Sequence, residues 1–195
     1  MKATTRNSRR QQRSQLQALA ASVLFALLPM GAICDTSQPQ VSEHELKAAL
    51  LFRVVKFIEW PASAFGAASA PFVMCVVGDE ARARAFQSLQ GRLLNGRHVA
   101  VRRVTGDMLD LGQCHAAFFP LDTDADVDYA LGKMRSAPLL TVGESDAFVN
   151  RGGTLALVTR DQRVQFTINL AASKRSQLAV SSQLLQLATV VGEST

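Results

Sequence analysis

Apolar residues between Ser42 and Trp60 recur at mixed three- and four-residue steps, the pattern of one face of an amphipathic helix. Ser42 is followed three residues later by Glu45, which is the spacing of a capping box at a helix N-terminus. Pro61 disfavours helical backbone at the residue before it, so the helix is predicted to end at about Trp60.

Strands and helices are predicted to alternate after this helix. Continuous apolar runs are typical of strands buried on both faces, and such strands are expected at 72–77 and 115–119, with further strands at 98–104 and 139–142. The segments between them predict helices or helical turns at 79–89, 107–111, 127–134 and 145–150. This alternation favours an α/β fold, with a mostly parallel sheet that is covered by helices.

The C-terminal part departs from this alternation. An apolar run at 154–159 is followed by a polar turn and then by 164–169, where apolar and polar residues alternate. Alternation with a period of two indicates a strand with one solvated face. We therefore expect a β-hairpin added to the sheet, and two short helices after it, at 170–176 and 181–190.

Residues 1–34 have the three parts of a secretory signal peptide. Five basic residues and no acidic residue lie in the first 13 positions, an apolar run extends from Ala18 to Leu28, and small residues follow it. The apolar run is about half the roughly 20 residues that a membrane-spanning helix needs, so cleavage is favoured over a retained anchor.

Two variants of the export signal are disfavoured. Ile33 stands before Cys34, where a lipoprotein signal needs a small residue, and the pair Arg9-Arg10 lacks the apolar residues that follow in a twin-arginine signal. The expected organisation is a signal peptide at 1–34 and a single domain at 35–195. This domain is expected in a periplasm, without direct membrane insertion after cleavage.

Removal of the signal peptide changes the charge of the chain. The chain has 21 basic and 16 acidic residues, and the five basic residues of the signal leave 16 of each sign in the domain. The high isoelectric point therefore comes from a discarded segment and does not indicate an acidic partner. No basic cluster with interleaved aromatic residues remains, so nucleic acid is not an expected partner.

Cys75 and Cys114 are the cysteines that remain if cleavage removes Cys34. An even number of cysteines in an oxidising compartment favours a disulfide. Closing this loop would stabilise the fold by roughly 4 kcal/mol in the chain-entropy model. The alternative is two buried free thiols, since both cysteines lie in apolar runs and free cysteine packs as a small hydrophobic residue.

No catalytic or metal-binding motif is complete in this sequence. Segment 91–96 has the glycine spacing of a phosphate loop, but Arg97-His98 stands where lysine and a hydroxyl are required. The alternating aspartates at 122–128 resemble the start of a calcium loop that lacks its glycine and glutamate, so a solvated loop is favoured. The histidines share no metal-ligand spacing. We expect no catalytic residue, metal or cofactor, which favours a binding or regulatory protein.

Three stretches of the chain, in the right order, resemble the YfiR family. Residues 47–61, from Lys-Ala-Ala to Glu-Trp-Pro, are similar to the opening helix of the family after its signal peptide. Residues 139–153 match its Leu-Thr-Val-Gly passage, followed by Phe and Gly-Gly. Residues 163–185 look like its ending, Arg-Val-x-Phe-x-Ile-Asn-Leu-Ala-Ala with a Ser-Ser-x-Leu-Leu helix. The resemblance covers nearly the whole mature chain.

This resemblance implies a periplasmic α/β protein with a roughly Rossmann-like sheet and no catalysis. The best-understood members bind the periplasmic sensory domain of an inner-membrane diguanylate cyclase and hold it inactive, which lowers cyclic di-GMP and restrains biofilm formation. Dimerisation and redox-sensitive disulfides belong to the same picture. Cys75 and Cys114 match the widely separated pair of the family, whereas its second, closely spaced pair has no counterpart, since 139–170 contains no cysteine.

Two surface hypotheses accompany this reading. The polar face of the hairpin carries Arg160, Arg163, Gln165 and Thr167. This face is predicted to contact a membrane cyclase or other membrane sensor. The alternative is an ordinary solvated hairpin. Phe57 and Trp60 either pack the first helix onto the sheet or form a pocket or a homodimer contact. The rival functions are a small-molecule-binding module that feeds a sensor kinase or transporter, and an uncharacterised hydrolase.

Overall fold

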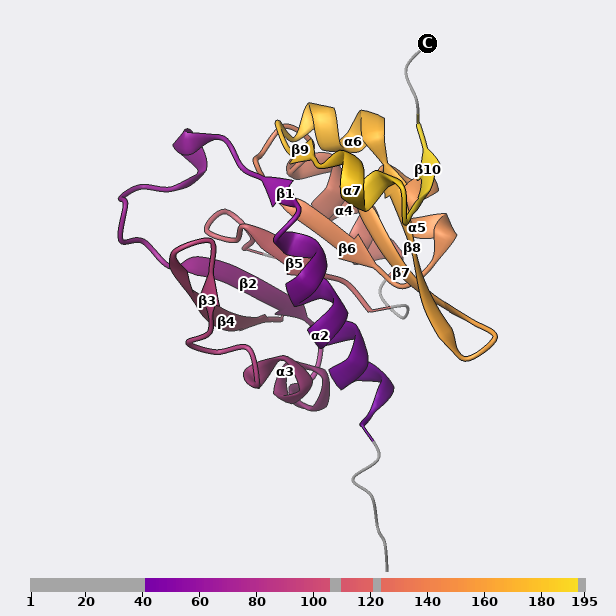
Figure 1. Cartoon of the computed structure of the whole chain (residues 1–195), viewed down its shortest axis with the longest axis horizontal. Helices are drawn as coiled ribbons and strands as arrows, with labels where there is room; N and C mark the ends of the chain where they lie inside the picture. The colour runs from indigo at the N-terminus through magenta and orange to yellow at the C-terminus, as the bar shows by residue number, and fades with distance from the viewer. Residues whose placement is uncertain (1–40, 106–109, 121–123, 193–195) are drawn as a thin grey trace, which may run out of the picture. The chain divides into compact units, whose positions relative to one another are not determined.

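The computed structural model describes residues 41–105, 110–120 and 124–192, and within them eight strands form one sheet (Figure 1). The central strands are parallel and lie in the spatial order β4 (Arg97–Val104), β2 (Phe72–Val77), β5 (Ala116–Phe118), β6 (Leu140–Gly143) and β7 (Leu155–Arg160). In chain order this is 2-1-3-4-5, the arrangement of a doubly wound sheet. The predicted mostly parallel, Rossmann-like sheet is confirmed.

Three further strands extend the parallel core. β3 (Leu93–Leu94) pairs antiparallel with β4, and β8 (Arg163–Asn169) pairs antiparallel with β7 as the predicted hairpin. β10 (Thr189–Val191) runs parallel to β8 and pairs with its last three residues. The hairpin at the C-terminal end of the chain is therefore confirmed.

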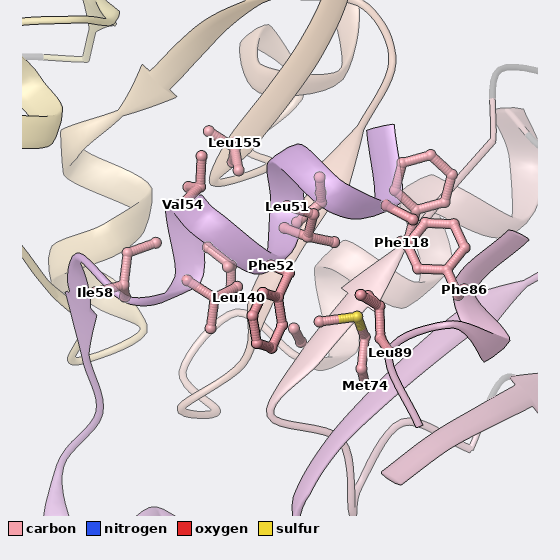
Figure 2. Packing of buried hydrophobic residues seen from close by; sticks show 14 of the residues in the cluster. Leu51, Phe52, Val54, Ile58, Met74, Phe86, Leu89, Phe118, Leu140 and Leu155 are labelled. Carbon is pink, nitrogen blue, oxygen red and sulfur yellow. The ribbon is translucent and has the colours of Figure 1, made fainter. Parts of the chain in front are cut away.

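Helices cover both faces of the sheet (Figure 1). Helices α2 (Glu43–Val55) and α3 (Glu80–Gln87) pack on one face, and α4 (Asp124–Lys133) and α5 (Asp146–Asn150) pack on the other. Strand β2 shows why both faces are apolar, since Met74 and Val76 join one core cluster while Cys75 and Val77 join the other. In Figure 2, Leu51 and Phe52 of α2 lie close to Met74 and Leu140 of the sheet. Burying such a side chain stabilises the fold by roughly 1.5–3 kcal/mol.

Helix α2 begins at the predicted capping box but ends earlier than predicted. The Glu45 backbone N–H donates a hydrogen bond to Ser42 Oγ at 3.2 Å, and the Ser42 backbone N–H donates to the Glu45 carboxylate at 2.8 Å. The helix stops at Val55 because β1 (Ile58–Glu59) pairs antiparallel with β9 (Ala179–Val180), a segment far away in the sequence. The predicted end at Trp60 is therefore wrong.

The C-terminal helices are also shorter than one prediction. α6 (Leu170–Arg175) fits the predicted helix, but the helix expected at 181–190 is only the single turn of α7 (Ser182–Leu185). The β-branched residues after α7 form β10 instead, because the edge of β8 offers them partners. The predicted signal peptide, most of the helical turn at 107–111 and the first of the 122–128 aspartates lie outside the described residues.

One of the family-like passages has a packing explanation. The ring of Phe148, on α5, lies against the backbone of Gly143 and of Gly153, and a Cβ atom on either glycine would overlap it. Phe148 is 3 % exposed and belongs to the core cluster around α4 and α5. The glycines are therefore required to seat this ring.

Candidate functional site

A pocket of about 310 Å³ opens at the amino-terminal edge of the sheet. Its walls come from β1, the loop that follows it, the first residue of β2 and the turn between β3 and β4, with the lining residues Ile58, Glu59, Trp60, Phe65, Phe72, Leu94, Asn95 and Arg97. The segment that resembled a phosphate loop is this turn: Asn95 and Gly96 have φ angles of +48° and +82°, as a two-residue hairpin turn of type I′ requires.

Trp60 both packs against the sheet and lines this pocket. Its indole N–H donates a hydrogen bond to the backbone oxygen of His115 at 3.0 Å, and its ring meets Phe72 edge to face at 5.0 Å. Trp60 therefore packs on the sheet at the rim of the pocket, although it lies outside α2. Phe57 differs, since it is 39 % exposed and is not part of the lining. Its predicted packing onto the sheet is wrong because α2 ends before it.

His115, whose backbone oxygen accepts the hydrogen bond from Trp60, is a structural histidine. Its ring stacks on Phe65 at 4.5 Å and on Phe72 at 5.2 Å, and it is 9 % exposed. The Val73 N–H donates to Nδ1 at 3.0 Å, so Nε2 carries the hydrogen that is donated to the Ala64 oxygen at 3.1 Å. Burial lowers the pKa of His115, and the nearby Arg97 cation lowers it further. The sequence indicated only that this histidine was a surface or a satisfied core residue, and the second alternative holds.

Arg97 ties the loop over the pocket to β4. Its guanidinium donates hydrogen bonds to the backbone oxygens of Ala67 and Ala70, at 2.9 Å and 2.7 Å. It also lies 3.9 Å from the centroid of the Phe65 ring, a cation–π contact. Arg97 and His115 therefore fix the loop at 61–71 from two sides, and neither role has a signal in the local sequence.

The opposite, carboxyl-terminal edge of the sheet holds a buried ion pair. Lys47 of α2 is 4 % exposed, and its Nζ lies 2.6 Å from Glu144 Oε1, just after β6, and 2.8 Å from Glu43 Oε1. Burial opposes the charge on Lys47, but the hydrogen bonds to Glu144 and Glu43 outweigh it and raise its pKa. These charges occupy the edge at which doubly wound sheets usually bind their ligands.

The hairpin residues predicted for partner binding divide into two groups. Arg160, Arg163 and Gln165 are exposed. Thr167 is 3 % exposed and donates a hydrogen bond to Asp146 Oδ1 at 2.9 Å, so the expectation that it faces solvent is wrong. The reason is that α5 begins beside this end of β8 and covers it. The same Asp146 carboxylate accepts a hydrogen bond from Arg160.

The hairpin extends beyond the strands that flank it (Figure 1). β6 pairs with β7 only at Leu155 and Ala156, and β10 pairs with β8 only from Thr167 onward. Within the described part of the chain, the residues 157–166 pair only with each other. Arg160 and Arg163 are direct cross-strand neighbours at the tip.

Cys75 and Cys114 form a disulfide in the structure, with a Cα–Cα distance of 5.9 Å. It connects the central strand β2 to Cys114, two residues before β5, and the free-thiol alternative does not hold. Cys75 is fully buried and Cys114 is 7 % exposed, so both sulfurs lie in the core around α4 and α5. Arg102 Nη2 lies 3.4 Å from Cys114 Sγ.

Within the described residues, no three or more His, Cys, Asp and Glu side chains are grouped as a metal ion would require. None of the helices in this part of the chain combines the length and the apolar character needed to cross a bilayer.

Comparison with known proteins gives one family. The model of a family described as YfiR/HmsC-like matches residues 44–189, which runs from the start of α2 to the start of β10. No curated protein matches the chain in sequence. Among solved structures, a conserved domain protein of Vibrio cholerae O1 biovar eltor is similar with a TM-score of 0.48 and 12 % identity, over 76 % of this chain. The chain covers 60 % of that protein's length.

Proposed function

Because the chain belongs to the YfiR/HmsC-like family, we propose that it is a non-enzymatic periplasmic regulator of a membrane-bound diguanylate cyclase. The signal peptide at 1–34 exports the domain, which then binds the periplasmic sensory part of the cyclase and holds the enzyme inactive. Cyclic di-GMP falls as a result, and biofilm formation is restrained.

The projecting hairpin is the observation that supports this proposal best. Its residues 157–166 extend past both neighbouring strands and leave backbone groups that a partner strand can pair with. Arg160, Arg163 and Gln165 surround the tip with exposed donors. A surface of this kind fits a protein partner better than a small molecule, because it projects past the neighbouring strands and carries exposed polar side chains.

Such a regulator needs no chemistry of its own. It inhibits a receptor if it binds the inactive conformation more tightly than the active one. Moving a two-state receptor from almost fully active to almost fully inactive requires about a 10⁴-fold difference in affinity. A protein surface that includes a hairpin and its neighbours can supply this difference.

The experiment is an affinity pull-down from solubilised membranes with the tagged protein, read by mass spectrometry. We expect a transmembrane diguanylate cyclase to be recovered, and cyclic di-GMP to rise when the gene is deleted. Recovery of a sensor kinase or transporter in its place would contradict the proposal.

Charge reversal tests the hairpin. Arg163→Glu is the sharper variant, because Arg160 also holds Asp146 and its replacement would disturb α5. We expect Arg163→Glu to weaken recovery of the cyclase at least about tenfold. The variant replaces a positive charge that would face an acidic group of the partner with a negative charge that this group repels. Arg84→Glu, on the exposed side of α3, is the matched control and should leave recovery unchanged. Equal recovery with both variants would remove the hairpin from the interface.

A small-molecule-binding module is the second candidate, and the pocket beside Trp60 favours it. The pocket is apolar on the side of Phe65 and Phe72 and charged at Glu59 and Arg97, so it would take a small amphipathic ligand. Trp60 is the only tryptophan of the chain, so its fluorescence reports on this pocket alone. A saturable fluorescence change in a screen of small amphipathic compounds would support this function.

We further propose that the exposed Phe57 contributes to a homodimer. Its ring lies between the end of α2 and β1, on a surface that also carries the Ser181 backbone N–H bonded to the Phe57 oxygen. Sedimentation of the Phe57→Ser variant should show a lower dimer fraction than the unaltered protein. An unchanged distribution would exclude Phe57 from a dimer contact.

A further inference from the structure

A second pocket, of about 230 Å³, lies where three helices of the chain end. α4 ends at Lys133, α5 at Asn150 and α6 at Arg175, and the residues at or just after these ends line the pocket together. It lies at the amino-terminal edge of β6 and β7, whereas the hairpin tip lies at the other end of β7.

Arginine dominates the charge of this pocket. Arg135, Arg151 and Arg175 line it, and the single acidic residue in the lining is Asp128. Arg151 Nε lies 3.7 Å from Asp128 Oδ1, and Arg175 Nη2 lies 3.8 Å from the place that a Cβ atom on Gly152 would occupy. The formal charge of these four side chains is therefore +2. Each arginine lies at the C-terminal end of its own helix, where the helix dipole favours a cation, and together they leave the lining with an excess of positive side chains, as an anion site requires.

Hydroxyl groups add further donors at the floor of the pocket. Thr154 is 3 % exposed, and its Oγ1 accepts a hydrogen bond from the Thr141 hydroxyl at 3.1 Å. Thr141 Oγ1 in turn accepts a hydrogen bond from the Thr154 backbone N–H at 2.9 Å, so one hydroxyl hydrogen of this pair is left for a further acceptor. Ser176 is 6 % exposed, lines the same pocket and makes no side-chain hydrogen bond within the described residues. Both hydroxyls lie at the pocket, where a ligand with acceptor oxygens can accept their hydrogens.

We propose that this pocket binds a phosphate group. A phosphate dianion balances the formal charge of +2, and its oxygens accept the paired N–H groups of arginine together with the two hydroxyls. The volume is below the 300–1,000 Å³ or so that is usual for larger ligands, which fits a single small anion or the phosphate end of a longer molecule. The site is separate from the hairpin, and its test does not depend on repression of a cyclase.

The test is a calorimetric titration of the purified protein with inorganic phosphate at constant ionic strength. We expect saturable binding with a Kd tighter than about 10 mM. Arg175→Gln should weaken it at least about tenfold, because a charge-assisted pair of hydrogen bonds is lost. Lys174→Gln removes the same charge from the same helix but lies outside the lining, so it is the matched control and should change the Kd less than about twofold.

A second variant guards against misfolding of the first. Arg135 is exposed and lies after the end of α4, so Arg135→Gln should keep the thermal midpoint while it weakens phosphate binding. Co-sedimentation with vesicles that contain phosphatidic acid separates the two sources of the group: co-sedimentation supports a lipid headgroup, and its absence with saturable phosphate binding supports a free phosphate. No saturable binding to the unaltered protein, or equal binding by the Arg175, Arg135 and Lys174 variants, would overturn the proposal.

Discussion

The two edges of the parallel sheet differ in a way that the fold alone does not suggest. At the carboxyl-terminal edge, where doubly wound sheets usually bind ligands, Lys47 is buried in an ion pair with Glu144. At the amino-terminal edge, two pockets open beside Trp60 and beside Arg175. The edge where such sheets usually bind ligands thus holds a stabilising ion pair, and two pockets lie at the opposite edge. A ligand site assigned from the fold class alone would not include these two pockets.

The largest expected effect comes from breaking the ion pair at the carboxyl-terminal edge. Lys47→Met leaves the Glu144 carboxylate buried without its cation, which should lower the free energy of unfolding by about 3–5 kcal/mol. Urea unfolding measures this. The double variant Lys47→Met/Glu144→Leu should recover much of the loss, because no buried charge remains. A loss below about 1 kcal/mol in the single variant would mean that the Lys47–Glu144 pair stabilises the fold no more than an ordinary surface ion pair.

The next effect lies at the amino-terminal edge. His115→Phe keeps the stacking on Phe65 but leaves the Val73 N–H and the Ala64 oxygen without their partner. An unsatisfied buried group costs about 1–3 kcal/mol, so we expect a loss of this size in urea unfolding. His98→Phe is the control, because His98 bonds only to the Gly91 oxygen at an exposed position. Equal losses of unfolding free energy in the two variants would contradict the role of the buried His115 hydrogen bonds in stability.

The same histidine should make stability depend on pH. Its pKa is lowered in the folded state, so between that pKa and its ordinary value of 6.5 the unfolded chain binds more protons than the folded one. Stability therefore rises with pH in this window and is lost as pH falls below 6.5, by at most about 1.4 kcal/mol per pH unit for one proton. The slope should be absent in His115→Phe. A slope of the same size in that variant would assign the effect to another group.

The smallest effect is local. Arg97→Gln removes the donors to Ala67 and Ala70, which should release the loop at 61–71 without unfolding the sheet. Amide hydrogen exchange in this loop should become about tenfold faster, while the urea midpoint changes little. Arg103→Gln, on the same strand but paired with Glu80, should leave the exchange of the loop unchanged.

Some helices and strands form because of residues that are adjacent in the chain, and local patterns in the sequence were sufficient to predict these elements. The capping box at Ser42, the apolar run of β2 and the alternation in β8 each fix one element from adjacent residues, and the structure has all three. Counting and the expected compartment also favoured the disulfide that the structure has, because only Cys75 and Cys114 would be left if cleavage removed Cys34.

The tertiary structure decided everything that depends on segments far apart in the chain. Pairing of β1 with β9 ended α2 early, and Asp146 buried the hydroxyl of Thr167 on a strand face that reads as solvated. The pockets have the same origin, since each gathers residues from at least three elements. A residue's neighbours in sequence set its backbone preference, but its burial, its charge environment and its place in a site are set by whichever distant segment the packing brings against it.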